Sequence, residues 1–163
     1  MPGFRTLLTA PVLVLACGFL FAPAVDAQLA DRKALTLDGA RRIMAAAEAE
    51  AMKNKWTVAI AIVDEGGELI AFHKIDDTQA ASIDVAIGKA RTAARMKRPT
   101  KALEDAVAGG RTVLLSVEGL VPLEGGVPIT VEGRIIGAVG VSGVTSQQDA
   151  QVAQAGIAAL GVK

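Results

Sequence analysis

The side chains of this sequence that are suited to chemistry are few and lie in three regions. The single histidine, His73, follows the apolar residues of a predicted strand. Lys89 and Arg91 lie two residues apart in a predicted helix, and Glu124 precedes a glycine pair at positions 125 and 126. Arginine and lysine together can bind a carboxylate, because one supplies a planar fork and the other a point charge. The backbone amides of a glycine pair can also bind an anion.

Each of these residues also has a purely structural interpretation. His73 is either a metal ligand or a surface imidazole at the end of a strand. Lys89 and Arg91 either contact a ligand or belong to the solvated face of an amphipathic helix. Gly125 and Gly126 either form an anion site or supply a loop that needs positive φ before a strand. The residue types alone leave both interpretations open in each case.

Several classes of site are excluded by what the sequence lacks. With one histidine and one cysteine, a single subunit cannot build the usual zinc site of histidine and cysteine ligands. Ser142 is followed by Gly143 and Val144, so the last glycine of a nucleophile elbow is missing. The glycine pairs match neither a Walker nor a dinucleotide fingerprint. The sequence therefore offers no convincing catalytic constellation.

Residues 1–27 are typical of a secretory signal peptide. Arg5 precedes an apolar run over residues 7–21, and small residues lead to a cleavage site after Ala27. Lipidation at Cys17 is an alternative reading of the same stretch. We expect residues 28–34 to form a short N-terminal segment and residues 35–163 to form one domain, in a periplasmic or secreted protein without stable membrane insertion after cleavage.

Composition limits the partners of this domain. Lysine plus arginine balance aspartate plus glutamate at 17 each, so no cationic field attracts nucleic acid. Hydrophobic residues make up 52% of the chain, which is more apolar surface than one small subunit readily hides. The composition therefore favours a homo-oligomer that binds a small molecule and no nucleic acid.

The hydrophobic pattern predicts an α+β domain. Helical periodicity begins after the N-cap Thr36 and recurs over residues 78–97, over residues 101–107 and after Ser146 as N-cap. Strands are predicted for residues 56–63, 68–73, 112–116, 127–131 and 134–141, and the last two are joined by a Glu-Gly turn at residues 132–133. We expect about five mostly antiparallel strands with flanking helices.

Three separated motifs resemble one known family. Residues 64–69 read Asp-Glu-Gly-Gly-Glu-Leu, residues 82–93 contain Gly-Lys-Ala-Arg-Thr-Ala, and residues 124–143 form the predicted hairpin. In this order they resemble the GlcG/HbpS family of small haem-binding-like α/β domains, which is related to the C-terminal domain of PduO-type corrinoid adenosyltransferases. The resemblance runs from about residue 35 to residue 160, and it implies a profilin-like or PAS-like sandwich.

The resemblance implies haem or a related tetrapyrrole as the ligand, so that the chain is expected to be an exported, oligomeric binding protein. The candidate ligand-binding residues are His73, Lys89, Arg91, Glu124, Gly125 and Gly126. His73 is also the candidate haem iron ligand, although many members of the family have an arginine near this position. Two alternatives belong to other classes. One is an enzyme or accessory protein acting on a small organic acid, as in glycolate metabolism, with its site at a subunit interface, and the other is an oligomer that binds a partner protein such as a sensor.

Overall fold

The structure is a computed structural model that describes residues 31–161. The predicted signal peptide lies outside the described residues. The four helices of this part of the chain are α1 (Leu37–Lys53), α2 (Ala81–Met96), α3 (Thr100–Ala108) and α4 (Ser146–Ala158), with a short 3₁₀ helix, η1 (Thr112–Ser116), after α3. The strands are β1 (Ala59–Asp64), β2 (Leu69–Lys74), β3 (Gly126–Val131) and β4 (Arg134–Ser142).

The four strands form one antiparallel sheet in the order β2-β1-β4-β3. Two hairpins build it, and each has a turn that its sequence explains. Glu132 and Gly133 both take positive φ between β3 and β4, as a two-residue hairpin turn requires. Between β1 and β2, the Asp64 carboxylate accepts hydrogen bonds from the amides of Gly66 and Glu68. β1 and β4, which come from different hairpins, then pair at the centre of the sheet.

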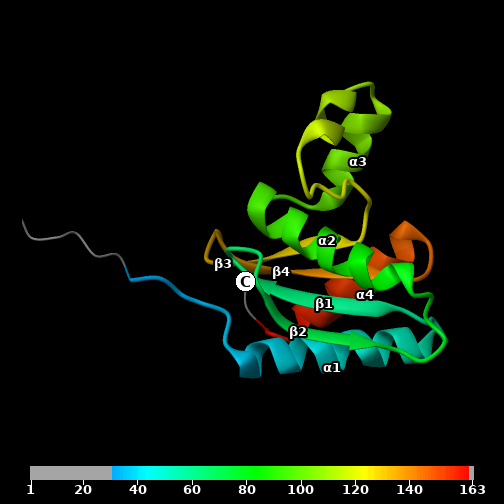
Figure 1. Ribbon diagram of the computed structural model, residues 1–163. Coiled ribbons are helices and arrows are strands. Elements are labelled where there is room, and N and C mark those ends of the chain that lie inside the picture. The colour runs from blue at the N-terminus through cyan, green and yellow to red at the C-terminus, as the bar shows by residue number, and fades with distance from the viewer. Residues whose placement is uncertain (1–30, 162–163) are drawn as a thin grey trace, which may run out of the picture. The chain divides into compact units, whose positions relative to one another are not determined.

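Helices cover both faces of the sheet (Figure 1). α1 and α4 pack on one face over a core of Ile, Val, Met and Ala side chains that includes Ile43, Ile60 and Ile62. α2 packs on the other face over a cluster in which seven of the eight buried residues are alanines. This arrangement confirms the predicted α+β class of antiparallel strands with flanking helices.

α2 lies directly on the backbone of β4. A Cβ atom added at Gly140 would stand 2.1 Å from the Ala86 carbonyl oxygen and 2.4 Å from the Ala90 nitrogen. These distances are far below van der Waals contact, so only glycine fits at this position. The glycine that the sequence places in the second strand of the hairpin therefore marks the close approach of a helix.

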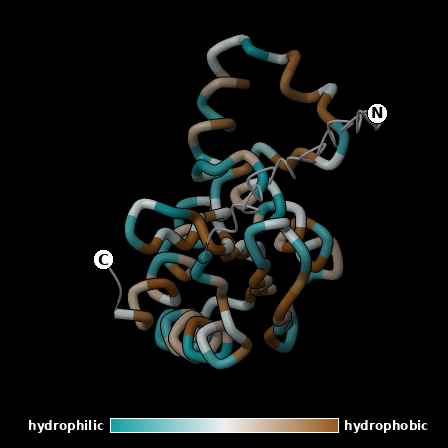
Figure 2. The backbone as a smooth tube through the Cα atoms, turned by 90° about the vertical axis from the view of Figure 1, so that its left-hand side faces the viewer, coloured by the Kyte–Doolittle hydropathy of each residue, from teal (hydrophilic) through white to brown (hydrophobic). Residues whose placement is uncertain are grey.

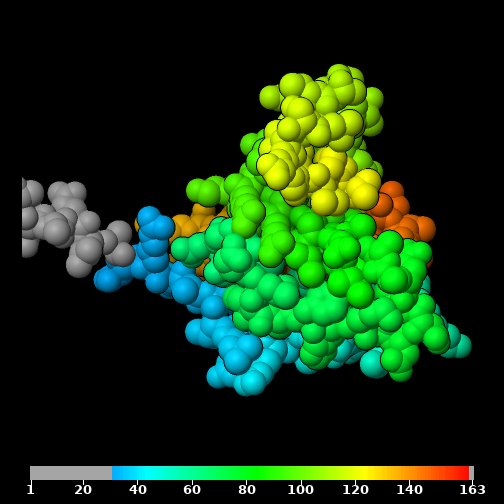
Figure 3. All heavy atoms as spheres, viewed as in Figure 1, coloured from blue at the N-terminus to red at the C-terminus, as the bar shows by residue number. Residues whose placement is uncertain are grey.

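The predicted strand at residues 112–116 is wrong, because this segment forms η1. Its apolar, β-branched pattern is typical of a buried strand, but only Leu114 is buried. Val113 and Leu115 are 67% and 60% exposed. The segment runs beside α3 above α2, away from both edges of the sheet, so no strand is available to pair with it (Figures 1 and 3). The sheet of the described residues consequently has four strands.

Candidate functional site

Four of the six predicted site residues come together where α2 meets the start of β3. Lys89 lies on α2, and Glu124, Gly125 and Gly126 lead into β3. A Cβ atom at Gly125 would stand 2.8 Å from the Lys89 ammonium, and one at Gly126 would stand 2.4 Å from the Lys89 carbonyl oxygen. Lys89 and the glycine pair are therefore neighbours in space.

Lys89 is buried inside the domain. Its ammonium donates to the Asp149 carboxylate at 2.8 Å and to the Val141 carbonyl oxygen at 3.0 Å. The side chains of Lys89 and Asp149 are only 3% and 2% exposed. This ion pair joins α2, β4 and α4, so Lys89 neither lies on a solvated helix face nor reaches the surface of the described domain.

Asp149 is the partner that sequence reasoning missed. Burial raises the pKa of the Asp149 carboxyl, while the Lys89 ammonium opposes that shift. The sequence predicted Ser146 as the N-cap of α4, but the cap is Thr145, whose hydroxyl accepts from the Gln148 amide in a capping box. The Thr-x-x-Gln spacing was the available signal. With Thr145 as the cap and Gln148 completing the capping box, Asp149 accepts from the Lys89 ammonium and from the Val144 amide.

The glycine pair is explained by packing against α2. Gly125 has φ of +122°, which confirms the need for positive φ in this loop. The Gly126 amide donates to the Thr100 hydroxyl at 2.9 Å, and the Gly125 carbonyl accepts from the Val141 amide at 3.0 Å. The Gly126 amide is therefore bonded within the domain, and its hydrogen is not directed at an external anion.

Glu124 lies beside a second carboxylate. Its amide donates to the Glu104 carboxylate, and one of its own carboxylate oxygens is buried without a hydrogen-bond partner among the described residues. The pKa of the Lys101 ammonium is raised, chiefly by Asp105, with smaller contributions from Glu124 and Glu104. This region is therefore acidic. It is poorly suited to haem propionates or to any other carboxylate ligand.

Arg91 points away from the Lys89 cluster because the two residues are two positions apart on a helix. Its Nε atom donates to the Gly67 carbonyl oxygen at 3.2 Å, and Arg95 donates to the Gly66 carbonyl oxygen at 2.7 Å. Both arginines thus tie α2 to the turn between β1 and β2. Arg91 is half-buried in this position.

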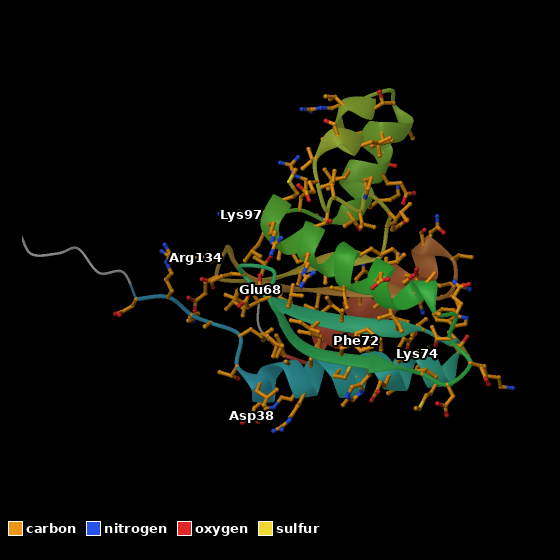
Figure 4. The ribbon with its side chains drawn as sticks, in the orientation of Figure 1. Asp38, Glu68, Phe72, Lys74, Lys97 and Arg134 are labelled. Carbon is orange, nitrogen blue, oxygen red and sulfur yellow. The ribbon has the colours of Figure 1, made fainter. Side chains whose placement is uncertain are left out.

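His73 lies apart from the other predicted residues, on the opposite face of the sheet from α2. It follows Phe72 and precedes Lys74 on β2 (Figure 4), and its Nδ1 atom contacts the Glu48 carboxylate of α1. The imidazole side chain is 54% exposed and that of Glu48 is 28% exposed.

A groove of about 120 Å³ opens at this point between α1 and β2. Its lining consists of Arg41, Met44, Ala45, Glu48, Ala71 and His73. The groove brings an imidazole, a carboxylate and a guanidinium to an otherwise apolar surface.

Within residues 31–161, no group of three or more His, Cys, Asp or Glu side chains is arranged to hold a metal ion. None of the helices in that range has the length and apolar character needed to span a membrane.

This fold and these motifs define a family. Residues 35–158 match the family described as "Haem degrading protein HbpS-like", and the chain belongs to that family. The chain is 50% identical to Protein GlcG of Escherichia coli (strain K12) over 103 residues, which span 63% of this chain and 77% of that protein. The predicted resemblance to the GlcG/HbpS family is confirmed.

Two solved structures extend the likeness to three dimensions. A double mutant of Streptomyces reticuli HbpS is 31% identical with a TM-score of 0.77, over 94% of this chain and 99% of that one. The protein crystallised as a PduOC:Heme complex is 31% identical with a TM-score of 0.76, over 80% of this chain and 98% of that one. Both cover nearly the whole of the compared chain, so the likeness concerns the complete domain.

Proposed function

We propose that this protein binds haem. The observation that carries the proposal is the likeness, over nearly the full domain, to a protein crystallised as a haem complex. The description of the family as haem-degrading supports the same ligand.

The groove between α1 and β2 is smaller than a haem macrocycle, at about 120 Å³, so only one edge of a haem would contact its residues. His73 is the single imidazole of the chain and can ligate iron. Ala45 and Ala71 would offer apolar surface to the edge of a macrocycle, and Arg41 would offer a guanidinium to a propionate. A bound haem would supply an iron centre that can take a further ligand or exchange an electron.

A hemin titration of the purified protein tests the proposal. We expect a saturable shift of the Soret band at one hemin per subunit, and no such shift with the urea-unfolded protein. A folded protein that leaves the hemin spectrum unchanged would contradict haem binding. Adding a reductant in air-saturated buffer and following the Soret band over time then separates storage from degradation, because reduction alone shifts the band, whereas oxidative degradation by oxygen bleaches it.

A small organic acid is the second candidate ligand. The observation that favours it is the size of the groove, since about 120 Å³ accommodates only a few atoms beside the guanidinium of Arg41. Lys89 is buried, so this alternative no longer relies on it. Glycolate that raises the melting temperature of the protein, with hemin producing no Soret shift, would favour the organic acid over haem.

Export and self-association belong to the same proposal. The signal pattern of residues 1–27 supports a periplasmic or secreted location. Self-association is supported by large apolar side chains on the surface around η1, including Val113, Leu115, Val117 and Leu123. Figure 2 shows the hydrophobic stretches of this projecting part of the chain.

A further inference from the structure

The face of the sheet that α2 covers is left open along one edge. α2 packs on β4, β1 and β3, but it barely contacts β2, which is the edge strand on this side of the sheet. The side chains of β2 that point to the α2 side of the sheet therefore lack a helix above them.

A bulge places two large apolar side chains of β2 on this open part of the face. Directly opposite residues of an antiparallel pair share a face of the sheet. Phe72 is opposite Ala61, and Leu69 is opposite Val63. Both of these β1 residues belong to the alanine-rich cluster beneath α2. Residues three apart in a regular strand would point to opposite faces, and the register shift in this hairpin brings Leu69 and Phe72 to the same one. Leu69 is consequently 45% exposed.

α2 extends this apolar strip and adds a charge at each end of it. Ile87 packs beside Phe72 against the alanine-rich cluster and is only partly buried. Asp84 lies three residues before Ile87 and Arg91 four residues after it, so the three share one flank of the helix. Asp84 is exposed and forms no ion pair with another of residues 31–161. Arg91 uses its Nε atom to bind Gly67, and its terminal nitrogens make no hydrogen bond within the same residues.

The order of these side chains makes the flank complementary to itself. Asp84 and Arg91 are about 10.5 Å apart along the helix axis, with Ile87 near the midpoint. A two-fold axis at Ile87 sets two α2 helices antiparallel and brings each Asp84 opposite Arg91 of the partner subunit. An isologous contact requires this kind of pattern, because the same surface must fit itself.

We propose that the flank formed by Leu69, Phe72, Asp84, Ile87 and Arg91 is a two-fold contact between two copies of this chain. The apolar strip is buried at its centre, and the two pairs of opposite charges determine its register. This inference rests on the proposed self-association and adds a second surface, separate from the apolar residues around η1. An oligomer with two kinds of contact uses both surfaces.

Two variants with opposite charge changes test the contact. Asp84→Arg makes both ends of the flank positive, and Arg91→Asp makes both ends negative. We expect either variant alone to associate at least about tenfold more weakly, and so to show a lower mass than the wild type in light scattering at the same micromolar concentration. An equimolar mixture of the two should recover the wild-type mass, because each contact then joins a positive flank to a negative one. A purely structural role of Asp84 and Arg91 predicts no recovery on mixing.

The matched control is Asp38→Arg. Asp38 is also an acidic residue in the first turn of a helix, but it lies on α1, which packs on the opposite face of the sheet. This variant loses the same favourable interaction with a helix dipole and should keep the wild-type mass.

The outcomes separate this contact from self-association in general. Asp84→Arg is decisive by itself if Arg91→Asp loosens the β1–β2 turn, because Asp84 takes part in no ion pair of the described domain. An Asp84→Arg protein with the wild-type mass overturns the contact and leaves self-association around η1 standing. Two folded variants that stay at a lower mass after mixing overturn the pairing of Asp84 with Arg91. A monomeric wild type contradicts the proposed self-association itself, and this contact with it.

Discussion

The buried pair of Lys89 and Asp149 allows a quantitative prediction about stability. Replacing Lys89 by methionine keeps most of the volume of the side chain and removes its ammonium. The Asp149 carboxylate is then left almost fully buried without its charged partner, and the Val144 amide donates to it only at 3.3 Å. Removing one partner of a buried ion pair costs about 3–5 kcal/mol, because the other charge stays desolvated. We expect a loss of that size in the free energy of unfolding at pH 7.

Urea denaturation measures this loss. With a slope of about 1–3 kcal/mol per molar urea for a small domain, the midpoint should fall by at least about 1 M. The matched control is Lys101→Met, because Lys101 also forms an ion pair with an aspartate, Asp105, but on the surface. The side chains of Lys101 and Asp105 are 44% and 61% exposed, so their pair is screened by water and its loss should leave the midpoint nearly unchanged.

The stability loss in Lys89→Met should depend on pH in a defined direction. Burial raises the pKa of Asp149 above its ordinary value of 3.8, so the folded state holds this proton more tightly than the unfolded state. The stability that Asp149 contributes is therefore full below the ordinary value and declines as the pH rises through the raised pKa. The penalty of Lys89→Met should shrink as the pH is lowered toward 4, because protonation removes the unpaired charge.

The double variant Lys89→Met, Asp149→Leu completes the cycle. Replacing both charges with apolar groups should restore much of the lost stability, since neither charge then remains buried. Equal, small effects of Lys89→Met and Lys101→Met would refute the reasoning. A Lys89→Met penalty that does not change between pH 7 and pH 4 would refute the assignment of the cost to the Asp149 carboxylate.

Three further predictions concern the packing of α2 on the sheet, the cleavage of the signal peptide and self-association. Gly140→Ala should destabilise the domain by about 1–3 kcal/mol or more in urea denaturation, because the added methyl meets the backbone of α2. In the control variant Gly66→Ala the added methyl meets only a side-chain oxygen at 3.3 Å, so the loss of stability should be smaller. The protein purified from its natural host should begin near Gln28 by mass spectrometry, and an intact Met1 would contradict export. Light scattering at micromolar concentration should give a multimer that Val113→Lys weakens, and a monomeric wild type would contradict self-association.

Local signals predicted most of the fold. The turn residues Glu132 and Gly133 determine the β3–β4 hairpin through their positive φ, and the Thr36 side chain caps α1 as its position indicates. The error at residues 112–116 arose because an apolar, β-branched run predicts a strand only if another strand is available to pair with it. Whether a strand lies beside this segment depends on the direction in which α3 carries the chain, and no local sequence pattern contains that information.

The candidate site was harder to predict because its contacts are long-range. Lys89 follows Ala86 by three residues and precedes Ala93 by four, so helical spacing placed it on the buried stripe of α2 all along. Its charge suggested an exposed position, and only the partner from α4, 60 residues away, makes its burial acceptable. Glu48 could not be connected to His73 from the sequence, because the crossing of α1 over β2 is a property of the tertiary packing.

The alanine-rich cluster between α2 and the sheet has a thermodynamic consequence. Alanine has no side-chain rotamers, so ordering the seven alanines of this layer costs essentially no side-chain conformational entropy. The isoleucines on the opposite face of the sheet each lose about 0.5–1 kcal/mol of rotamer freedom, and they bury more apolar area in return. The α2 layer therefore forms with a small entropic loss and a small hydrophobic gain. Its stability depends on the fit of backbone against backbone, which no change of rotamer can relax.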